Sequence, residues 1–388
     1  MKNPVPYVLA MLLVAGVASG ATITVRKDGT GNFTVIQQAL NVAAAGDTIL
    51  IGPGEYLDKT WIRFPAWSWD IESYANVTVD NLTIIGAGSG QTIIGPTTYS
   101  GDYSTESPQI ITNVGRGDLS ISGVCLRNAH TGVSLVGRLF MDRCALTNNL
   151  INVGWEAIGS GGWIRDSQFD VTTPSWPISI DIINQGGAAD ILVENCTVQH
   201  SKVIVDGVDG AVFRGCSLSN TWGAFQVYGG VRVQISASTV TSSAKNAIEL
   251  TLGSGSVCVI DDSEISGGQG ALTAVDNGCR FEVMHSRLTG GSYAVMYTQN
   301  NAGASSVTGC DIVKGSGAAV RCDDAGSWVT HDFRNNYWGT TSEADIQSWI
   351  IDHNDNPNIP ATVLFAPFAG QSVPAETTTW GDLKALFR

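Results

Sequence analysis

The 388-residue sequence lacks several features that would identify a common class of protein. Charged residues make up only 14% of the chain, and 35 acidic residues outnumber 21 basic ones, so the net charge is −14. Nucleic-acid binding needs a basic face, and this charge argues against such a partner. No Cys-x-x-Cys pair occurs, so a structural zinc site is not expected. Beyond the first twenty residues, no apolar run is long enough for a membrane span.

Residues 119–338 also lack the 3.6-residue apolar periodicity of helices, and short strand-like runs stand between turn residues instead. Three columns of residues recur once every 20–29 positions. The first column is small or weakly polar: Val124, Cys144, Ser167, Cys196, Cys216, Ser238, Ser263, Ser286, Cys310 and Asn336. Apolar residues stand three positions before each of these and two positions after each of them. Such a repeat indicates stacked units that bury a shared core.

The repeat predicts an all-β fold, a single-stranded parallel β-helix (a solenoid) of about ten or more coils. Stacked coils bring like residues over like, at a spacing of roughly 4.8 Å. Helices are expected to cap both ends of the solenoid. Thr34 and Gln37 form a capping-box pattern ahead of the first, and Ser342 and Asp345 form a similar one ahead of the second.

The domain organisation follows from the two ends of the chain. Residues 1–20 have the charged start, apolar stretch and small final residues of a signal peptide. We therefore expect a secreted protein that is located outside the cell, in the periplasm or on the cell surface. Residues 21–368 form the β-helix domain. Residues 369–388 read as a linker and a short amphipathic tail, which we expect to dock on the rod, on a partner or on secretion machinery.

The eight cysteines leave two interpretations open. Export permits disulfides, and Cys196 and Cys216 fall in adjacent coils, close enough to bond if their side chains turn toward each other. Cys144 and Cys310 share the same interior column, however. Buried free thiols acting as small apolar residues explain this placement equally.

Three early segments carry a family resemblance, namely 23–40, 45–56 and 82–94. They resemble the opening of pectinesterases and other pectate-lyase-like proteins. The closing stretch, 335–357, is similar to the ends of many secreted bacterial β-helix repeat proteins. The resemblance implies a right-handed parallel β-helix whose working surface is the outer face of one sheet and its loops.

The catalytic motifs of the related enzyme families do not carry over. The Gln-Ala-Val, Gln-Asp-Thr and Asp-Phe-Ile-Phe-Gly runs of pectinesterases are missing. Of the polygalacturonase motifs only Asp-Asp occurs, at 261–262 and 323–324, where turns explain it. The Arg-x-Pro-x-x-Arg of pectate lyases is absent, and 206–209 only faintly resembles their spaced aspartates. The resemblance therefore implies architecture and leaves activity open.

Candidate catalytic residues come from a second strand run that follows the first column by about ten positions. Alternation places Asp181, Asp206, Gln226 and Glu249 on the outer face of four successive coils, with the register at Asp206 open by one residue because the apolar run 203–205 precedes it. Asp206 and Glu249 would be roughly 10 Å apart along the backbone, and side chains can close this to the 6.5–9.5 Å of inverting glycosidases. Like charges on Asp181 and Asp206 would raise one pKa. A solvated acidic stripe is the alternative.

Aromatic residues flank these carboxylates and are candidates for stacking on sugar rings. The predicted substrate-binding residues are Trp155, Trp176, Trp222, Gln226 and Tyr228. The alternative is that each tryptophan folds over a glycine-rich corner. A further aromatic loop, 61–74, would form either a binding lip or a plug against the first coils.

Two functions remain open from the sequence. The first is a secreted protein that binds a polysaccharide or cell-surface glycan and degrades or modifies it, as a polysaccharide lyase or glycoside hydrolase would. The second is a non-catalytic surface or matrix protein with a structural or adhesive role. The negative charge disfavours an acidic polysaccharide unless Ca²⁺ bridges the two, and no metal ligands are assigned.

Overall fold

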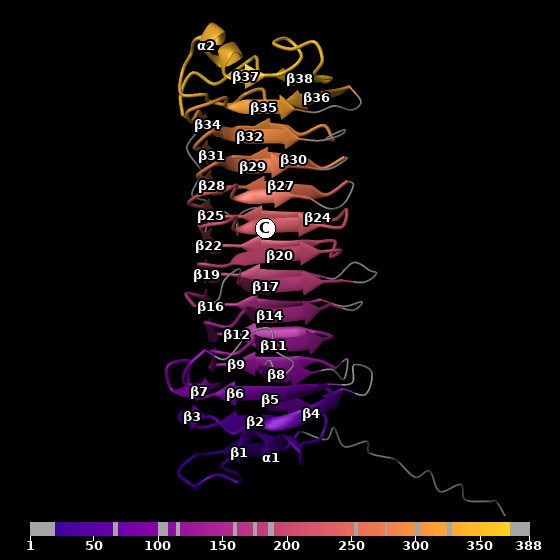
Figure 1. The fold of residues 1–388 in the computed structure, drawn as a ribbon, viewed down its shortest axis with the longest axis vertical. Coiled ribbons are helices and arrows are strands. Elements are labelled where there is room, and N and C mark those ends of the chain that lie inside the picture. The colour runs from indigo at the N-terminus through magenta and orange to yellow at the C-terminus, as the bar shows by residue number, and fades with distance from the viewer. Residues whose placement is uncertain are drawn as a thin grey trace, which may run out of the picture.

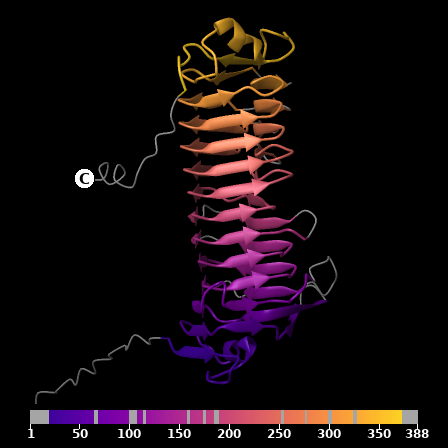
Figure 2. The ribbon, with the colours of Figure 1, turned by 90° about the vertical axis from the view of Figure 1, so that its left-hand side faces the viewer.

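The chain folds as a rod of stacked coils, with three parallel sheets running along its length (Figure 1). The structure is a computed structural model and describes residues 20–64, 69–99, 108–113, 117–157, 161–173, 177–184, 190–251, 255–275, 278–298, 303–323 and 328–372, without the side chains of residues 63, 64 and 69. The rod has about 11 turns. A view from the side shows each coil lying directly over the one before it (Figure 2). The predicted all-β parallel β-helix is confirmed.

The sheets are named A, B and C, and within the described residues they hold 14, 11 and 13 strands. Sheet A contains β1 (Thr22–Val25), β2 (Thr48–Ile51), β6 (Leu82–Gly86), β9 (Leu119–Ser122), β12 (Leu139–Asp142), β15 (Gly162–Arg165), β18 (Ile191–Glu194), β21 (Ala211–Arg214), β24 (Arg232–Ser236), β27 (Val257–Asp261), β30 (Arg280–Met284), β33 (Ser306–Thr308), β36 (Val329–Asp332) and β38 (Ala361–Leu364). Sheet B contains β3 (Gly54–Tyr56), β7 (Thr92–Ile94), β10 (Cys125–Arg127), β13 (Ala145–Thr147), β16 (Gln168–Asp170), β19 (Thr197–Gln199), β22 (Ser217–Asn220), β25 (Thr239–Ser242), β28 (Glu264–Gly267), β31 (Arg287–Gly290) and β34 (Asp311–Val313). Sheet C contains β4 (Thr60–Phe64), β5 (Trp69–Val77), β8 (Gln109–Asn113), β11 (Thr131–Val136), β14 (Ile151–Glu156), β17 (Ile178–Ile183), β20 (Lys202–Asp206), β23 (Phe225–Tyr228), β26 (Ile248–Leu250), β29 (Gly270–Ala274), β32 (Tyr293–Thr298), β35 (Val320–Asp323) and β37 (Ile350–Ile351).

The corner between sheets A and B is a tight turn that uses one left-handed residue per coil. These residues have φ between 46° and 65°: Gly123, Arg143, Asp166, Asn195, Gly215, Ala237, Asp262, His285, Gly309 and Asn335. Each stands one position before a residue of the small, weakly polar column. A single left-handed residue reverses the chain direction in the least space, and glycine, asparagine and aspartate tolerate that conformation best.

The small column itself forms a hydrogen-bonded ladder inside the corner. The Ser263 hydroxyl accepts the backbone N–H of Ser238 at 3.1 Å and donates to the carbonyl of Asp261 at 2.8 Å. The Ser286 hydroxyl repeats the pattern, because it accepts the N–H of Ser263 at 3.1 Å. A small hydroxyl or thiol therefore satisfies a backbone group that the turn leaves without a partner.

The apolar columns fill the interior as predicted. The residues two positions after the small column are all buried: Leu126, Leu146, Phe169, Val198, Leu218, Val240, Ile265, Leu288, Ile312 and Trp338. All eight cysteines are free thiols, seven of them buried. Cys196 and Cys216 do not form the disulfide that the sequence allowed, because their thiols donate to the carbonyls of Glu194 and Arg214, at 3.3 Å and 3.4 Å. The buried-thiol interpretation is confirmed.

Two short helices lie near the ends of the rod (Figure 1). Helix α1 (Ile36–Leu40) begins after Val35, which makes no side-chain cap, so the capping box predicted at Thr34 and Gln37 is wrong. The Gln37 side chain instead bonds both the carbonyl and the N–H of Asn76, at 3.3 Å and 2.8 Å, which ties the helix to β5. Helix α2 (Glu343–Ser348) has the predicted cap, since the Ser342 hydroxyl accepts the N–H of Asp345.

The aromatic segment 61–74 is not a loop. It forms most of an antiparallel hairpin, in which β4 pairs with β5 at the edge of sheet C. Trp61 is 56% exposed and Tyr74 is buried, so the segment contributes to both surface and core. Residues 65–68 lie outside the described residues, as do the signal-peptide residues 1–19 and the tail residues 373–388. No helix in the described ranges has the length and apolar character to cross a membrane.

Candidate functional site

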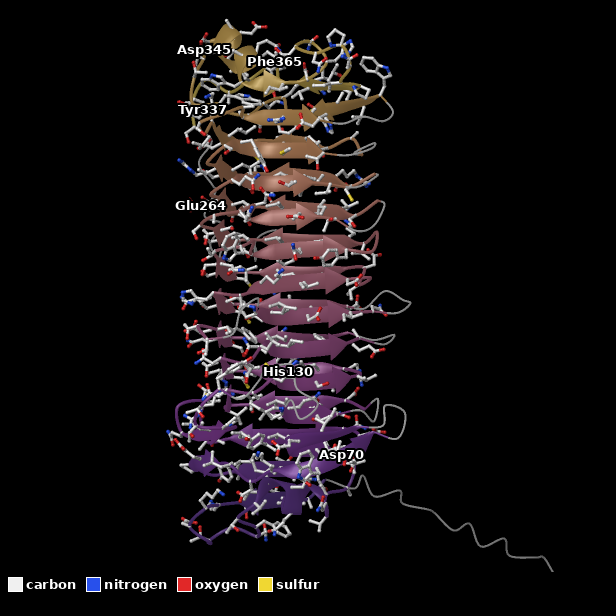
Figure 3. All side chains as sticks on the ribbon, in the orientation of Figure 1. Asp70, His130, Glu264, Tyr337, Asp345 and Phe365 are labelled. Atoms are coloured by element: carbon white, nitrogen blue, oxygen red, sulfur yellow. The ribbon has the colours of Figure 1, made fainter. Side chains whose placement is uncertain are left out.

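Six polar side chains lie on the outer face of sheet C, on four successive coils. They are Asp181 on β17, Lys202 and Asp206 on β20, Gln226 and Tyr228 on β23, and Glu249 on β26, and all six are half-buried. Alternation along the strands fixes their direction: Ile182, Val205, Val227 and Leu250 are their buried neighbours. Side chains project from the outer face of every coil in this way (Figure 3). We call these six residues the Tyr228 cluster.

The register of the cluster differs from the prediction. Asp181 pairs with Ile204, Ile204 with Gln226, and Gln226 with Glu249, so these four form one outward column. Asp206 lies in the next column, paired with Ile183 below and Tyr228 above. The prediction that Asp206 stands in one column with the other carboxylates is therefore wrong. Val203 and Val205 are the buried residues of β20, which leaves the apolar Ile204 at the central outward position.

Tyr228 nevertheless has all three predicted carboxylates around it. Burial raises the pKa of its phenol, and the negative charges of Glu249, Asp206 and Asp181 raise it further. The pKa of Asp181 is also raised, first by burial and then by the charge of Asp206. Asp181 pairs with Ile204, and Asp206 lies two residues beyond Ile204 on the same strand, so the two carboxylates are diagonal neighbours, whose backbones lie roughly 7–8 Å apart in a sheet.

Gln226 connects the cationic and phenolic members of the cluster. Its side-chain oxygen accepts from the Lys202 ammonium at 3.3 Å and from the Tyr228 hydroxyl at 2.8 Å. Burial lowers the pKa of Lys202, and the charge of Glu249 opposes that effect. Lys202 was not predicted from the sequence, although its position one residue before the buried Val203 already places it on the outer face.

The three tryptophans predicted to bind substrate differ in where they lie. Trp155 is buried with 1% exposure, and its indole N–H donates to the carbonyl of Gly137 at 2.7 Å, so the prediction that it binds substrate is wrong. It occupies an inward position of β14, in register with Leu135 and Ile182. Trp222 is 57% exposed, and the Lys245 ammonium lies 5.8 Å from its ring centroid. Trp176 lies outside the described residues.

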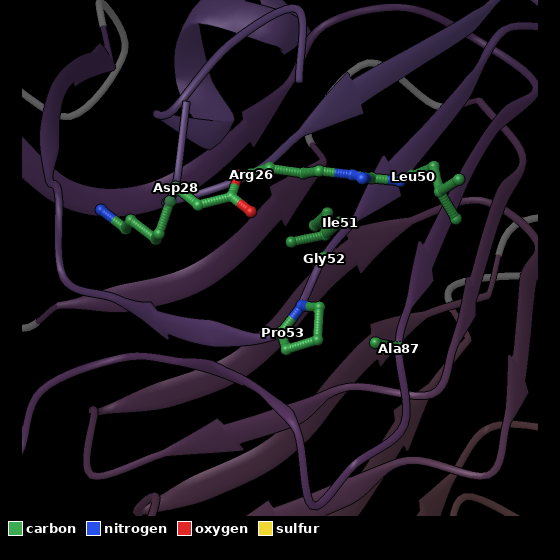
Figure 4. A pocket seen from close by; sticks show the side chains of 8 residues that line it. Arg26, Asp28, Leu50, Ile51, Gly52, Pro53 and Ala87 are labelled. Carbon is green, nitrogen blue, oxygen red and sulfur yellow. The ribbon is translucent and has the colours of Figure 1, made fainter. Parts of the chain in front are cut away.

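A separate pocket of about 550 Å³ lies at the N-terminal end of the rod (Figure 4). It is lined by Arg26, Lys27, Asp28, Leu50, Ile51, Gly52, Pro53 and Ala87. Its charged groups have partners, since Lys27 pairs with Asp58 at 2.5 Å and Asp28 accepts the Thr30 hydroxyl at 2.7 Å. No site was predicted there.

Metal binding has no support from side-chain clustering in the part of the chain that is described. No three His, Cys, Asp or Glu side chains gather there as a potential ligand set. Residues 352–355, an acidic segment near the C-terminal end of the rod, form a turn. The buried Asp352 carboxylate accepts the N–H groups of Asn354 and Val363, at 2.8 Å and 2.9 Å.

Comparison with known proteins supports the fold. Residues 179–337 match the family model described as "Right handed beta helix region". The catalytic unit of the thermostable GH87 α-1,3-glucanase from Streptomyces thermodiastaticus strain HF3-3 is similar at a TM-score of 0.50 and 14% identity, over 89% of this chain and 68% of that chain. The Agl-KA catalytic domain is similar at a TM-score of 0.59 and 15% identity, over 93% of this chain and 70% of that chain.

No curated protein matches the sequence. The two structural likenesses, at identities this low, concern the fold and not the chemistry. The handedness of the coils comes from the family match, and the stacking of the three sheets comes from the structure itself. The chain therefore folds as a right-handed parallel β-helix, as predicted, and residues 179–337 carry the family match.

Proposed function

We propose that the Tyr228 cluster binds a polysaccharide and cleaves it by hydrolysis. The observation that carries this proposal is the placement of Asp181, Asp206 and Glu249 at outward positions of successive strands of sheet C, on the two strands before that of Tyr228 and on the strand after it. Two structures with the same fold support it in a general way, since one is a GH87 α-1,3-glucanase and the other is a catalytic domain. The net charge of −14 favours a neutral glycan over an acidic one.

The carboxyl pair in this proposal is Asp181 and Asp206, not Asp206 and Glu249. The raised pKa of Asp181 suits a general acid, which must hold its proton near the working pH. Asp206 then acts as the base. Its diagonal position, roughly 7–8 Å away by backbone, is compatible with the 6.5–9.5 Å carboxyl separation of inverting glycosidases.

The proposed reaction balances with water as the only co-reactant. The water oxygen attacks the anomeric carbon while Asp206 accepts the water proton. The bond from that carbon to the glycosidic oxygen breaks, and the leaving oxygen takes the proton of Asp181. Glu249 and Tyr228 hold the sugar on the face, together with the exposed ring of Trp222, which stands shortly before β23 in the same coil.

The test is reducing-sugar release from a panel of neutral polysaccharides, after a glycan array has found those that bind. Asp181→Asn and Asp206→Asn should each lower the release of product by about a hundredfold or more, because each removes one proton transfer. Glu249→Gln should mainly weaken binding. Thermal midpoints should change little, since all three side chains lie on the outer face.

Glu264→Gln is the matched control, because Glu264 is an exposed carboxylate on sheet B and should leave release unchanged. If the native protein binds glycans without turnover, the hydrolytic part of the proposal is wrong. If no glycan binds, the structural or adhesive function is favoured instead.

The proposed substrate agrees with the expected location. A polysaccharide of this kind is met outside the cytoplasm, and the signal-peptide pattern of residues 1–20 would export the chain. Expression of the full-length chain in a bacterial host, followed by N-terminal sequencing of the exported protein, should find a start at Ala21. The uncleaved protein in the cytoplasm would contradict this.

A further inference from the structure

Gln226 holds the central position in the Tyr228 cluster, and its side chain has only one possible orientation. An amide side chain can be turned by half a rotation without changing its shape, so its oxygen must be identified from its partners. The Lys202 ammonium lies 3.3 Å from one of the two terminal atoms, and an ammonium has hydrogens to donate but no lone pair to accept. That atom is therefore the oxygen.

The Tyr228 hydroxyl points to the same oxygen, at 2.8 Å. Both lone pairs of the oxygen are then used, one by Lys202 and one by Tyr228. The amide nitrogen, with its two hydrogens, makes no hydrogen bond to any other described residue. The half-buried position of Gln226 on the outer face leaves these two hydrogens toward solvent.

We propose that Gln226 is the specificity-determining residue of this site, and that it selects neutral sugars through their hydroxyl groups. The inference rests on the proposed polysaccharide-binding function. A sugar hydroxyl accepts one hydrogen bond from the Gln226 amide and donates its own hydrogen to the Glu249 carboxylate, which is the next residue in the column. A hydroxyl satisfies both neighbours because it is a donor and an acceptor at once.

A uronic acid does not fit the same position. Its carboxylate accepts hydrogen bonds but has no hydrogen to give to Glu249. It also brings a negative charge beside the carboxylates of Asp206 and Glu249, and like charges at this distance repel. Lys202 is the cation of the cluster, and it is already directed to the oxygen of Gln226. The site therefore disfavours a uronic acid whose carboxylate faces Glu249.

Lys202 and Tyr228 are positioning residues in this arrangement, since they act through the amide. Removal of the Lys202 ammonium leaves the amide held by one donor that can itself rotate and accept. The amide then turns freely, and the hydrogens no longer face the ligand in a fixed direction. Arginine in place of lysine keeps a donor at this position and should keep the orientation.

The experiment uses calorimetry to measure the affinity of the full chain for two classes of probe. The first is a panel of neutral gluco-oligosaccharides that includes the α-1,3-linked series, and the second is oligogalacturonate. The native protein should bind a neutral probe and show no binding to oligogalacturonate. Gln226→Glu keeps the shape and both acceptor contacts but removes the amide hydrogens, and should weaken neutral binding about tenfold or more. Gln234→Glu, an exposed glutamine on sheet A, is the matched control and should bind as the native protein does.

A second pair of variants separates orientation from simple packing. Lys202→Met should weaken binding of the neutral probe several-fold, whereas Lys202→Arg should bind it about as tightly as the native protein does. Thermal midpoints are measured for each variant. Binding by Gln226→Glu within twofold of the native protein overturns the inference, as does a preference of the native protein for oligogalacturonate. If the native protein binds neither probe class, the proposed function itself fails. If a neutral probe binds equally well to the native protein and to Gln226→Glu, only the role of Gln226 fails.

Discussion

His331 is a buried imidazole near the C-terminal end of the rod, and its environment makes the fold sensitive to acid. It has no measurable exposure, its ring stacks on Tyr297 at 3.9 Å, and its Nδ1 accepts the N–H of Ser305 at 3.3 Å. Its other ring nitrogen is buried without a partner among the described residues. Burial lowers the pKa of His331 to about 4.

The lowered pKa predicts a loss of stability between pH 6.5 and pH 4. Above this range both folded and unfolded His331 are neutral. Within it the unfolded chain binds a proton that the folded chain does not, so stability falls as the pH falls, by about 3 kcal/mol in total. His331→Asn should remove this part of the pH dependence when urea unfolding is measured at pH 7 and pH 4.5.

Gln234→Asn serves as the control, because Gln234 is an exposed residue on β24 that carries no titratable group. A native-like drop in stability between the two pH values in His331→Asn would contradict the assignment.

At the scale of the element, the corner between sheets A and B decides how one coil follows another. The left-handed residue makes the turn, and the small residue after it supplies the hydrogen bond that the turned backbone lacks. This explains why the column tolerates serine, cysteine and asparagine but no large side chain. The sequence predicted a tight corner from the small column, whereas the ladder of hydrogen bonds required the structure.

Loss of one hydroxyl from the ladder should be costly. Ser263→Ala leaves the buried N–H of Ser238 without its acceptor, which should lower the free energy of unfolding by about 1–3 kcal/mol. Ser263→Cys should cost less, because cysteine occupies the same column in neighbouring coils. Ser266→Ala, on the outer face of β28, should change stability by less than about 0.5 kcal/mol. Chemical denaturation of the three variants measures the difference, and equal effects for Ser263→Ala and Ser266→Ala would disprove the role of the ladder.

At the scale of the whole molecule, stability comes from contacts between neighbouring coils along the rod and not from one central core. Each strand of sheet A pairs only with the strand before it and the strand after it. The last strand, β38, has one such neighbour, β36. Repeat proteins of this kind behave as a row of units held by nearest-neighbour contacts.

Amide hydrogen exchange should therefore be slowest in the middle of the rod. The central strands β21 and β24 are expected to exchange more slowly than β38, because opening a central coil breaks two interfaces and opening the last breaks one. Mass spectrometry of exchanged peptides measures this order. Uniform exchange along the rod would mean that the molecule opens only as a single cooperative unit.

The sequence by itself determined the architecture of this protein, since the spacing of the small and apolar columns is a local property that each coil repeats. It also named the three carboxylates, the glutamine and the tyrosine of the candidate site. The tertiary structure decided the register, which moved Asp206 out of the predicted column, and the direction of Trp155, which points into the core. A shift in where each strand begins changes which outward residues meet, and the apolar run 203–205 left the register at Asp206 open by one residue. The same applies to the bonds from Lys202 and Tyr228 to Gln226, because contacts between coils depend on how the coils stack.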